Sequence, residues 1–257
     1  MSGFCGNHLA ARFNSEQIER LGRDGKIPKG LDIVFDLAAY GNMAGHQGKP
    51  QEIYKANLMR VIDEMDYLGN AKYIYISTSS VILPVQTPYS ASKKAAEEFL
   101  KIQDKRIAIV RPFTIVGIGD QKEHLIPKLI DSCLSGIEIP FVPEPVHDFL
   151  DVEDFVDALL VIKDRAQFNG EIYEVGSGKQ ISNDEVRLLI EQETGRKANI
   201  KIVERMRAYD TKIWQANLER ISTLGWKPKK DLRQSIKEMV NNYENNHYNI
   251  DLFDRQR

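Results

Sequence analysis

The residues best suited to acid/base chemistry are Tyr89 and Lys93, which stand four positions apart in the segment YSASK. Residues with this spacing lie on one face of a helix, so the lysine ammonium can approach the phenol. A nearby cation favours the phenolate and lowers the pKa of a tyrosine from about 10, which makes the phenol usable as an acid or base near neutral pH. Thr78, at the end of a preceding strand pattern, could hydrogen-bond the same substrate oxygen. Alone, this spacing is more typical of a solvated helix face, so the surrounding sequence has to be considered.

The elements that must position these residues alternate between strand and helix patterns. Runs rich in β-branched and aromatic residues predict strands at 32–37, 72–78 and 106–111. Helical spacing of apolar residues predicts helices at 51–68 and 89–100. This alternation indicates βαβ units and a parallel sheet covered by helices. Such sheets bind ligands outside the carboxyl ends of their strands.

After Thr114 the pattern loosens into segments that are interrupted by proline and glycine. Further helices are predicted at 126–134, 152–162, 183–194 and 232–243. Ser182 and Glu185 have the spacing of a capping box, which marks the start of a helix. The tail after Asn245 is polar and lacks periodicity, so we expect it to fray.

Composition and charge exclude several classes of function. The chain is 42% hydrophobic and 28% charged, as is usual for a soluble globular protein. Its net charge of −2 provides no basic field for nucleic acid or an anionic membrane. Cys5 and Cys133 are too few and too scattered for a disulfide framework or a zinc site, so no metal is expected. There is no apolar run of the roughly twenty residues that cross a bilayer and no signal region, so we expect a cytoplasmic protein.

Several motifs follow one another in an order known from one family. They are GFCGNHL at 3–9, DIVFDLAAY at 32–40, STSSV at 77–81 with PYSASK at 88–93, RPF at 111–113 with VGIGD at 116–120, HDFLDVEDF at 147–155, YEVGS at 173–177 and LGWKP at 224–228. Together they resemble the extended short-chain dehydrogenase/reductase family of NAD-dependent epimerases and dehydratases, which modify nucleotide sugars. The resemblance implies an α/β fold, a Rossmann-like doubly wound parallel sheet with a smaller C-terminal substrate-binding part.

The resemblance also implies a division into two domains. Residues 1–114 with parts of 140–175 would form the NAD(P)-binding domain, and residues 115–140 with 176–245 the smaller substrate-binding domain. Gly3 and Gly6 fill the second and third glycine positions of the family's G-x-x-G-x-x-G loop. The first glycine and the first strand would then lie before Met1, so the Rossmann-like sheet is expected to be N-terminally truncated. Either the native chain starts upstream or the fold has lost this strand, and we favour the former.

For the site, the resemblance implies hydride transfer. Tyr89 would be the general acid/base, Lys93 would tune it and hold the nicotinamide ribose, and Thr78 would orient the reacting oxygen. The implied cofactor-binding residues are Gly3, Phe4, Cys5, Gly6, Arg23, Leu37, Ala38, Ala39, Asn57, Tyr89, Lys93 and Pro112. An arginine such as Arg23 can accept the 2′-phosphate of NADP, whereas an acidic residue such as Asp24 can bind the ribose of NAD. The cofactor is therefore expected to be NAD or NADP, with a slight tilt toward NADP.

Members of this family act mostly on nucleotide diphosphate sugars, and the implied substrate-binding residues are Ser79, Ser80, Thr114, Lys128 and His147. His147 stands where the family often has an arginine, which grips a diphosphate bidentately. Relatives that dehydrate the sugar carry an Asp-Glu pair where Ser79 and Ser80 stand, so dehydration is disfavoured.

We therefore expect a nucleotide-sugar 4-epimerase, with a ketosugar reductase as the alternative. A catalytically degenerate dinucleotide-binding protein is the alternative of another class. The helices expected at 51–68 and 89–100 commonly form the family's dimer bundle, so we also expect a homodimer.

Overall fold

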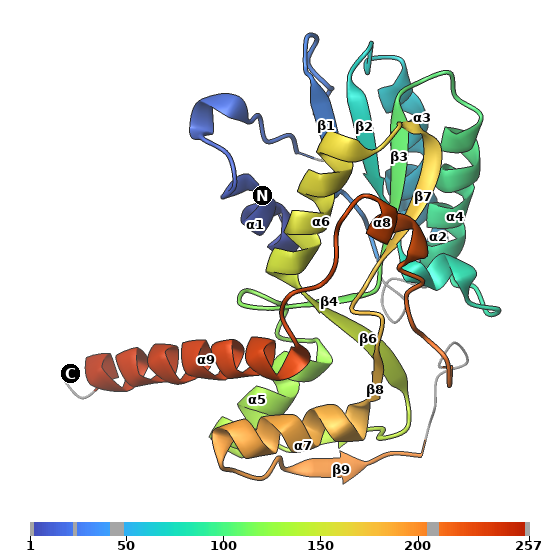
Figure 1. The fold of residues 1–257 in the computed structure, drawn as a ribbon. Coiled ribbons are helices and arrows are strands. Elements are labelled where there is room, and N and C mark those ends of the chain that lie inside the picture. The colour runs from blue at the N-terminus through green and yellow to red at the C-terminus, as the bar shows by residue number, and fades with distance from the viewer. Residues whose placement is uncertain (1–2, 23–24, 42–48, 205–210, 255–257) are drawn as a thin grey trace. The chain divides into compact units, whose positions relative to one another are not determined.

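The computed structural model describes residues 3–22, 25–41, 49–204 and 211–254, with side chains as far as Asn245. The chain divides into two compact units (Figure 1). The first comprises Met1–Phe113, Phe155–Val175 and Ala216–Lys227, and the second Thr114–Asp154, Gly176–Gln215 and Pro228–Arg257. The first unit thus includes residues 216–227, and the assignment of NAD(P) binding and substrate binding to separate domains stays a prediction.

The first unit contains a four-stranded parallel sheet with the order β1 (Ile33–Asp36), β2 (Lys72–Ile76), β3 (Ile107–Pro112) and β7 (Asn169–Val175). β1 and β2 lie within their predicted runs, and β3 overlaps the third predicted run and ends one residue beyond it, at Pro112. The consecutive residues Tyr73–Tyr75 of β2 and Ile107–Val110 of β3 are buried, as is typical of a parallel sheet covered on both faces. The predicted α/β class with a parallel sheet is confirmed.

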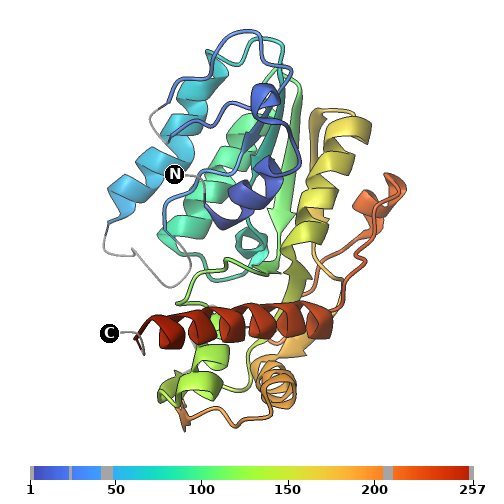
Figure 2. The same cartoon turned by 90° about the vertical axis from the view of Figure 1, so that its left-hand side faces the viewer.

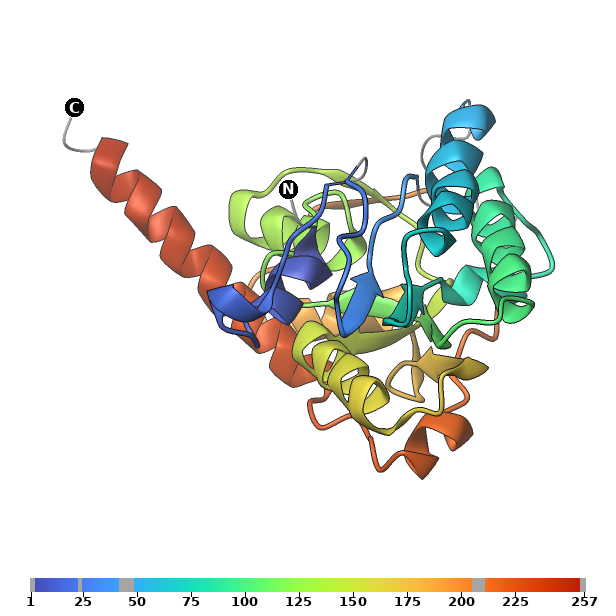
Figure 3. The ribbon, with the colours of Figure 1, turned by 90° about the horizontal axis from the view of Figure 1, so that it is seen from above.

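Helices cover this sheet on both sides (Figure 3). On one side lie α4 (Pro88–Lys101) and a continuous helical stretch made of α2 (Pro50–Tyr54), the π-helical η2 (Lys55–Met59) and α3 (Arg60–Met65). Alternate residues of the two central strands point toward these helices, namely Tyr73 and Tyr75 of β2 and Ile107 and Ile109 of β3. They form an apolar core with the helix residues Val61, Met65, Ala96 and Leu100. On the other side lies α6 (Val152–Arg165), of which the part from Phe155 onward belongs to this unit.

The remaining elements of the first unit are short. They are α1 (Phe4–Ala10), the 3-10 helices η1 (Ser15–Gln17) and η3 (Ser79–Ile82), and α8 (Glu219–Thr223). The segment predicted to resemble a Gly-rich loop therefore opens a helix, with Gly3 as its extended N-cap.

The second unit combines small sheets with three longer helices. β4 (Thr114–Val116), β6 (Val146–Asp151) and β8 (Gln180–Ser182) form one sheet, and β5 (Ile139–Phe141) pairs with β9 (Ile200–Ile202). The helices α5 (Leu125–Ser135), α7 (Asn183–Thr194) and α9 (Leu232–Asp254) share an apolar core, and Figure 2 shows α9 lying across the other two.

Two predictions for the second unit have different outcomes. The capping box at the start of α7 is confirmed, because Ser182 Oγ accepts from the Glu185 amide at 3.2 Å and the Glu185 carboxylate accepts from the Ser182 amide at 2.8 Å. The fraying expected after Asn245 is not seen, since α9 continues to Asp254. Buried Ile236 and Met239 anchor the first turns of this helix, and its backbone ladder extends past them.

None of the helices in the described part of the chain is long and apolar enough to cross a bilayer.

Candidate active site

The first three strands of the parallel sheet deliver several predicted site residues to one edge. Leu37 follows β1, Thr78 lies two residues after β2, and Pro112 is the last residue of β3. Because parallel strands end at the same edge of a sheet, these residues lie along the carboxyl edge, where this class of sheet binds ligands. Leu37, Thr78 and Pro112 are each partly exposed.

Tyr89 lies in the first turn of α4, at a helix start that is strongly specified by sequence. Thr87 is the N-cap and Pro88 occupies the first helical position. The Thr87 amide donates to Ser90 Oγ at 2.9 Å, and Ser90 Oγ donates to the Thr87 carbonyl at 3.2 Å. The position of Tyr89 relative to the strand end is therefore fixed by local capping.

Thr78 contacts both Tyr89 and the following turn. Its hydroxyl hydrogen-bonds with the Tyr89 side chain. It also lies 2.9 Å from Ser80 Oγ and accepts from the Ser80 amide at 3.3 Å. Ser79 and Ser80 are only 3% and 1% exposed. Among these three hydroxyl residues, Thr78 is therefore the partly exposed one, whereas Ser79 and Ser80 are buried.

The expectation that Lys93 lowers the pKa of Tyr89 is wrong for this structure. Burial raises the pKa of the Tyr89 phenol, and the hydrogen bond with Thr78 opposes this only in part. The physical reason is the direction of the lysine side chain. Lys93 Nζ lies 4.2 Å from the centre of the Tyr75 ring instead of acting on the phenol.

Lys93 is the most unusual charged group of the site. Its side chain is fully buried, and its ammonium has no hydrogen-bond partner among the described residues. Burial lowers its pKa to about 8, although the negative charges of Asp36, Glu97 and Glu64 oppose this. A buried ammonium without acceptors is costly, and native proteins rarely leave one so. The arrangement therefore fits a ligand that brings hydroxyl or other acceptor oxygens to Nζ, as the ribose of a dinucleotide would.

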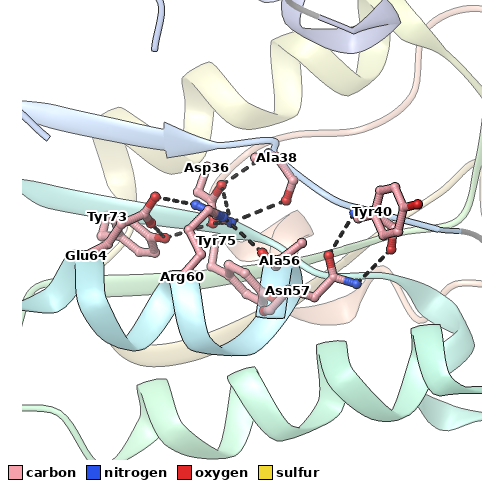
Figure 4. Close-up of polar contacts among 9 residues, drawn as sticks. All are labelled: Asp36, Ala38, Tyr40, Ala56, Asn57, Arg60, Glu64, Tyr73 and Tyr75. Carbon is pink, nitrogen blue, oxygen red and sulfur yellow. Dashed lines mark hydrogen bonds and ion pairs between the residues drawn. The ribbon is translucent and has the colours of Figure 1, made fainter. Parts of the chain in front are cut away.

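Asn57 holds the loop after β1, which is a structural role that the sequence did not reveal. Its amide nitrogen donates to the Tyr40 carbonyl at 3.0 Å, and its oxygen accepts from the Tyr40 amide at 2.8 Å (Figure 4). The same amide nitrogen also donates to Ser92 Oγ at 3.1 Å. Ser92 Oγ in turn donates to the Tyr89 carbonyl at 2.8 Å. Both amide hydrogens of Asn57 are thus used within the protein. The loop with Ala38 and Ala39 is tied through Asn57 to the helix that carries Tyr89.

A cluster of charged residues beside this loop was missed by the sequence analysis. Asp36, Arg60, Glu64 and Tyr73 are joined by hydrogen bonds and ion pairs (Figure 4). The spacing of Arg60 and Glu64 is a recognisable helical ion-pair signal. Their common partner Asp36 could not be inferred, because it comes from another element.

The remaining predicted cofactor-binding residues come from the N-terminal segment before β1. Gly3, Phe4, Cys5 and Gly6 belong to the N-cap and first turn of α1, and a Cβ added to Gly3 would meet nothing within 4 Å. A close approach that requires glycine is therefore not evident at Gly3. Arg23, like Asp24, lies outside the described residues.

The three substrate residues predicted after residue 113 belong to the second unit. Thr114 begins β4, Lys128 is exposed on α5, and His147 lies in β6. The His147 ring lies 5.1 Å from the Trp214 ring and 5.5 Å from the Phe149 ring. The candidate site of the first unit thus comprises Thr78, Tyr89, Lys93 and the loop after β1. Within the described ranges no group of three or more histidine, cysteine or acidic residues could hold a metal ion.

Comparison with known proteins finds a matching family, similar enzymes and similar solved structures. Residues 25–176 match the family described as "NAD dependent epimerase/dehydratase family". A putative UDP-glucose 4-epimerase of Methanocaldococcus jannaschii is 27% identical over 92% of this chain and 85% of that protein. The GDP-6-deoxy-D-mannose reductase of Pseudomonas aeruginosa is 24% identical over 95% of each. The solved structure of RMD from Pseudomonas aeruginosa, complexed with NADPH, has a TM-score of 0.82 at 22% identity and covers 95% of this chain and 96% of that one.

Proposed function

Because this chain belongs to the NAD dependent epimerase/dehydratase family of extended short-chain dehydrogenases/reductases, we propose that it is an NAD(P)-dependent nucleotide-sugar 4-epimerase. The observation that carries the proposal is the buried ammonium of Lys93, which lacks a hydrogen-bond partner among the described residues and lies one helical turn after Tyr89. Burial of an ammonium without hydrogen-bond acceptors is costly, and a bound ligand that supplies acceptors would offset this cost.

The residues of the first unit divide the chemistry among them. Lys93 and the main chain of Leu37–Ala39 would hold the dinucleotide. A bound nicotinamide ring supplies the acceptor and donor of the hydride at the sugar C4 carbon. Tyr89 takes the proton of the C4 hydroxyl and later returns it, while the Thr78 hydroxyl donates a hydrogen bond to the same oxygen.

The protonation state of Tyr89 gives Lys93 a second role. Burial keeps the Tyr89 phenol protonated in the ligand-free protein, because it raises the pKa. Formation of the phenolate base needs a positive charge near the ring. Lys93 lies one turn along the same helix face, and a swing of Nζ from Tyr75 toward Tyr89 would provide that charge.

Dehydration and one-way reduction are the two related reactions that have to be distinguished from epimerisation. Dehydration is disfavoured, since hydroxyls of Ser79 and Ser80 stand where dehydrating relatives carry carboxylates. A one-way ketosugar reductase is the second candidate, because a curated reductase resembles the chain over 95% of its length.

The test is incubation of the chain with NAD or NADP and a panel of UDP-, GDP-, CDP- and dTDP-hexoses, and in parallel with NADH or NADPH and the corresponding 4-ketosugars. An epimerase inverts C4, which NMR coupling constants report, without net consumption of the dinucleotide. A reductase consumes reduced dinucleotide in proportion to product. Replacing Tyr89→Phe is expected to lower kcat by about 10²–10⁴-fold while the dinucleotide still binds. Binding without turnover of any sugar would refute the enzyme and favour a dinucleotide-binding protein, and binding of neither dinucleotide would refute the proposal altogether.

A further inference from the structure

Arg60 occupies the centre of the charged cluster beside the loop after β1. Its Nη2 lies 2.8 and 3.0 Å from the two carboxylate oxygens of Asp36, and its Nη1 contacts the Glu64 carboxylate (Figure 4). Its Nε donates to the Ala56 carbonyl at 3.0 Å. The guanidinium therefore uses all of its nitrogens within the protein, and its side chain is only 14% exposed.

Tyr73 completes the cluster from β2. Its hydroxyl lies 2.8 Å from Asp36 and 2.7 Å from Glu64, so a single phenolic hydrogen serves two carboxylates. Burial and the neighbouring Asp36 charge raise the pKa of Glu64, while Arg60 lowers it. One guanidinium thus compensates two crowded carboxylates, and without it these would repel each other.

The cluster reaches the main chain of the loop through Ala38. The Ala38 amide donates to Asp36 Oδ1 at 3.1 Å, and the Ala38 carbonyl lies 3.4 Å from Arg60 Nη2. Arg60 is anchored on α3, so this helix holds the Ala38 carbonyl directly and holds the Ala38 amide only through the Asp36 carboxylate. Asn57 fastens the loop at Tyr40 in the same way.

The same charges act on Lys93. The groups that act on its ammonium are Asp36 of β1, Glu64 and Arg60 of α3, and Glu97 of α4, with the Tyr75 ring of β2 at 4.2 Å. Three of these are carboxylates, and Arg60 is the cation that counters them. The electrostatic potential at the Lys93 ammonium therefore depends on whether the cluster is intact.

We propose that Arg60 is a positioning residue of the dinucleotide site, which clamps Ala38 onto α3 and balances Asp36 and Glu64 beside Lys93. This inference rests on the proposed function, since it assumes that the loop after β1 binds a dinucleotide. Arg60 itself need not touch the dinucleotide. It acts through the main chain of Leu37–Ala39 and through the charge near Lys93.

The test compares Arg60→Met with Arg187→Met as a matched control. Arg187 is 17% exposed and bridges Asp184 and Glu191 on α7, so it reproduces a helix-borne arginine between two carboxylates in the other unit. The first readout needs no ligand. It is the hydrogen-exchange rate of the Ala38 amide by NMR, with the Tyr40 amide, which Asn57 holds, as an internal reference.

We expect Arg60→Met to free the Asp36 carboxylate that accepts from the Ala38 amide, which should speed exchange at Ala38 by about tenfold or more. It should weaken NAD or NADP binding in calorimetry by about tenfold, which corresponds to about 1.4 kcal/mol. Arg187→Met should change neither. Arg60→Lys keeps the charge and loses the fork, so it should speed Ala38 exchange while leaving the pH dependence of activity unchanged.

Failure of this inference and failure of the proposed function give different results. If folded Arg60→Met keeps both the Ala38 exchange rate and the dissociation constant within twofold of wild type, Arg60 is not a positioning residue. If Arg60→Met does not fold, unchanged exchange and binding in Arg60→Lys overturn the clamp. If the wild-type protein binds neither dinucleotide, the proposed function falls, and the inference, which assigns the clamp to a dinucleotide site, falls with it. A fast Ala38 amide in Arg60→Met would then show a purely structural clamp.

Discussion

Replacing the buried Lys93 is expected to make the protein more stable at neutral pH. At pH 7 the ammonium is charged in the folded and in the unfolded chain. Burial lowers its pKa from the ordinary 10.5 to about 8, which corresponds to about 3 kcal/mol against the charged form in the fold. The attraction to the Tyr75 ring, with the ammonium 4.2 Å from its centre, returns about 1–2 kcal/mol. Methionine has a similar length and neither effect, so Lys93→Met should raise the free energy of unfolding by about 1–2 kcal/mol.

The pH dependence of this gain identifies its cause. Between about pH 8 and 10.5 the folded protein releases the Lys93 proton while the unfolded chain retains it, so the wild type becomes more stable relative to the variant. The gain should therefore be full at pH 7 and largely gone at about pH 10. Urea unfolding followed by circular dichroism at both pH values measures it. The control is Lys94→Met on the exposed side of the same helix, which should change stability by less than about 0.5 kcal/mol.

Two results would refute the reasoning about Lys93. One is a Lys93→Met variant that is less stable than wild type at pH 7. The other is a gain that is equal at both pH values, which would indicate better apolar packing instead of a removed charge. A variant that is more stable and also inactive in the sugar assay would support a lysine that is kept for binding at the expense of stability.

Other consequences follow from particular contacts. Glu97 is fully buried and accepts from the Arg111 guanidinium at 2.6 and 3.0 Å, so Glu97→Gln should cost about 3 kcal/mol in urea unfolding, and a loss below about 0.5 kcal/mol would contradict a buried pair. Ser182→Ala removes the N-cap of α7 and should cost about 1 kcal/mol, with Ser182→Gly costing less. Gly225 has a φ of +79°, so Gly225→Ala should lower stability by about 1–2 kcal/mol, and an unchanged melting temperature would show that the turn relaxes.

Secondary structure was predictable wherever one periodicity dominated. The helix pattern at 183–194 matches α7 in full, because a capping box opens it and a glycine in the left-handed region closes it. The apolar runs at 72–78 and 106–111 matched β2 and β3, since strands buried on both faces are apolar throughout. The end of α9 was not predictable, because the residues after Asn245 carry no periodic signal.

The sequence by itself determined which groups could do chemistry and that they meet at one edge of a sheet. Tyr89 and Lys93 share a helix face by their spacing, and Thr78 follows closely after the strand that precedes them. Only the tertiary structure decided the direction of the Lys93 side chain and the partners of Asn57. It also joined Asp36, Arg60 and Tyr73, which come from three elements, into one cluster. The reason is that spacing along a chain reports local geometry, whereas the burial and charge that set a pKa come from residues brought together by the fold.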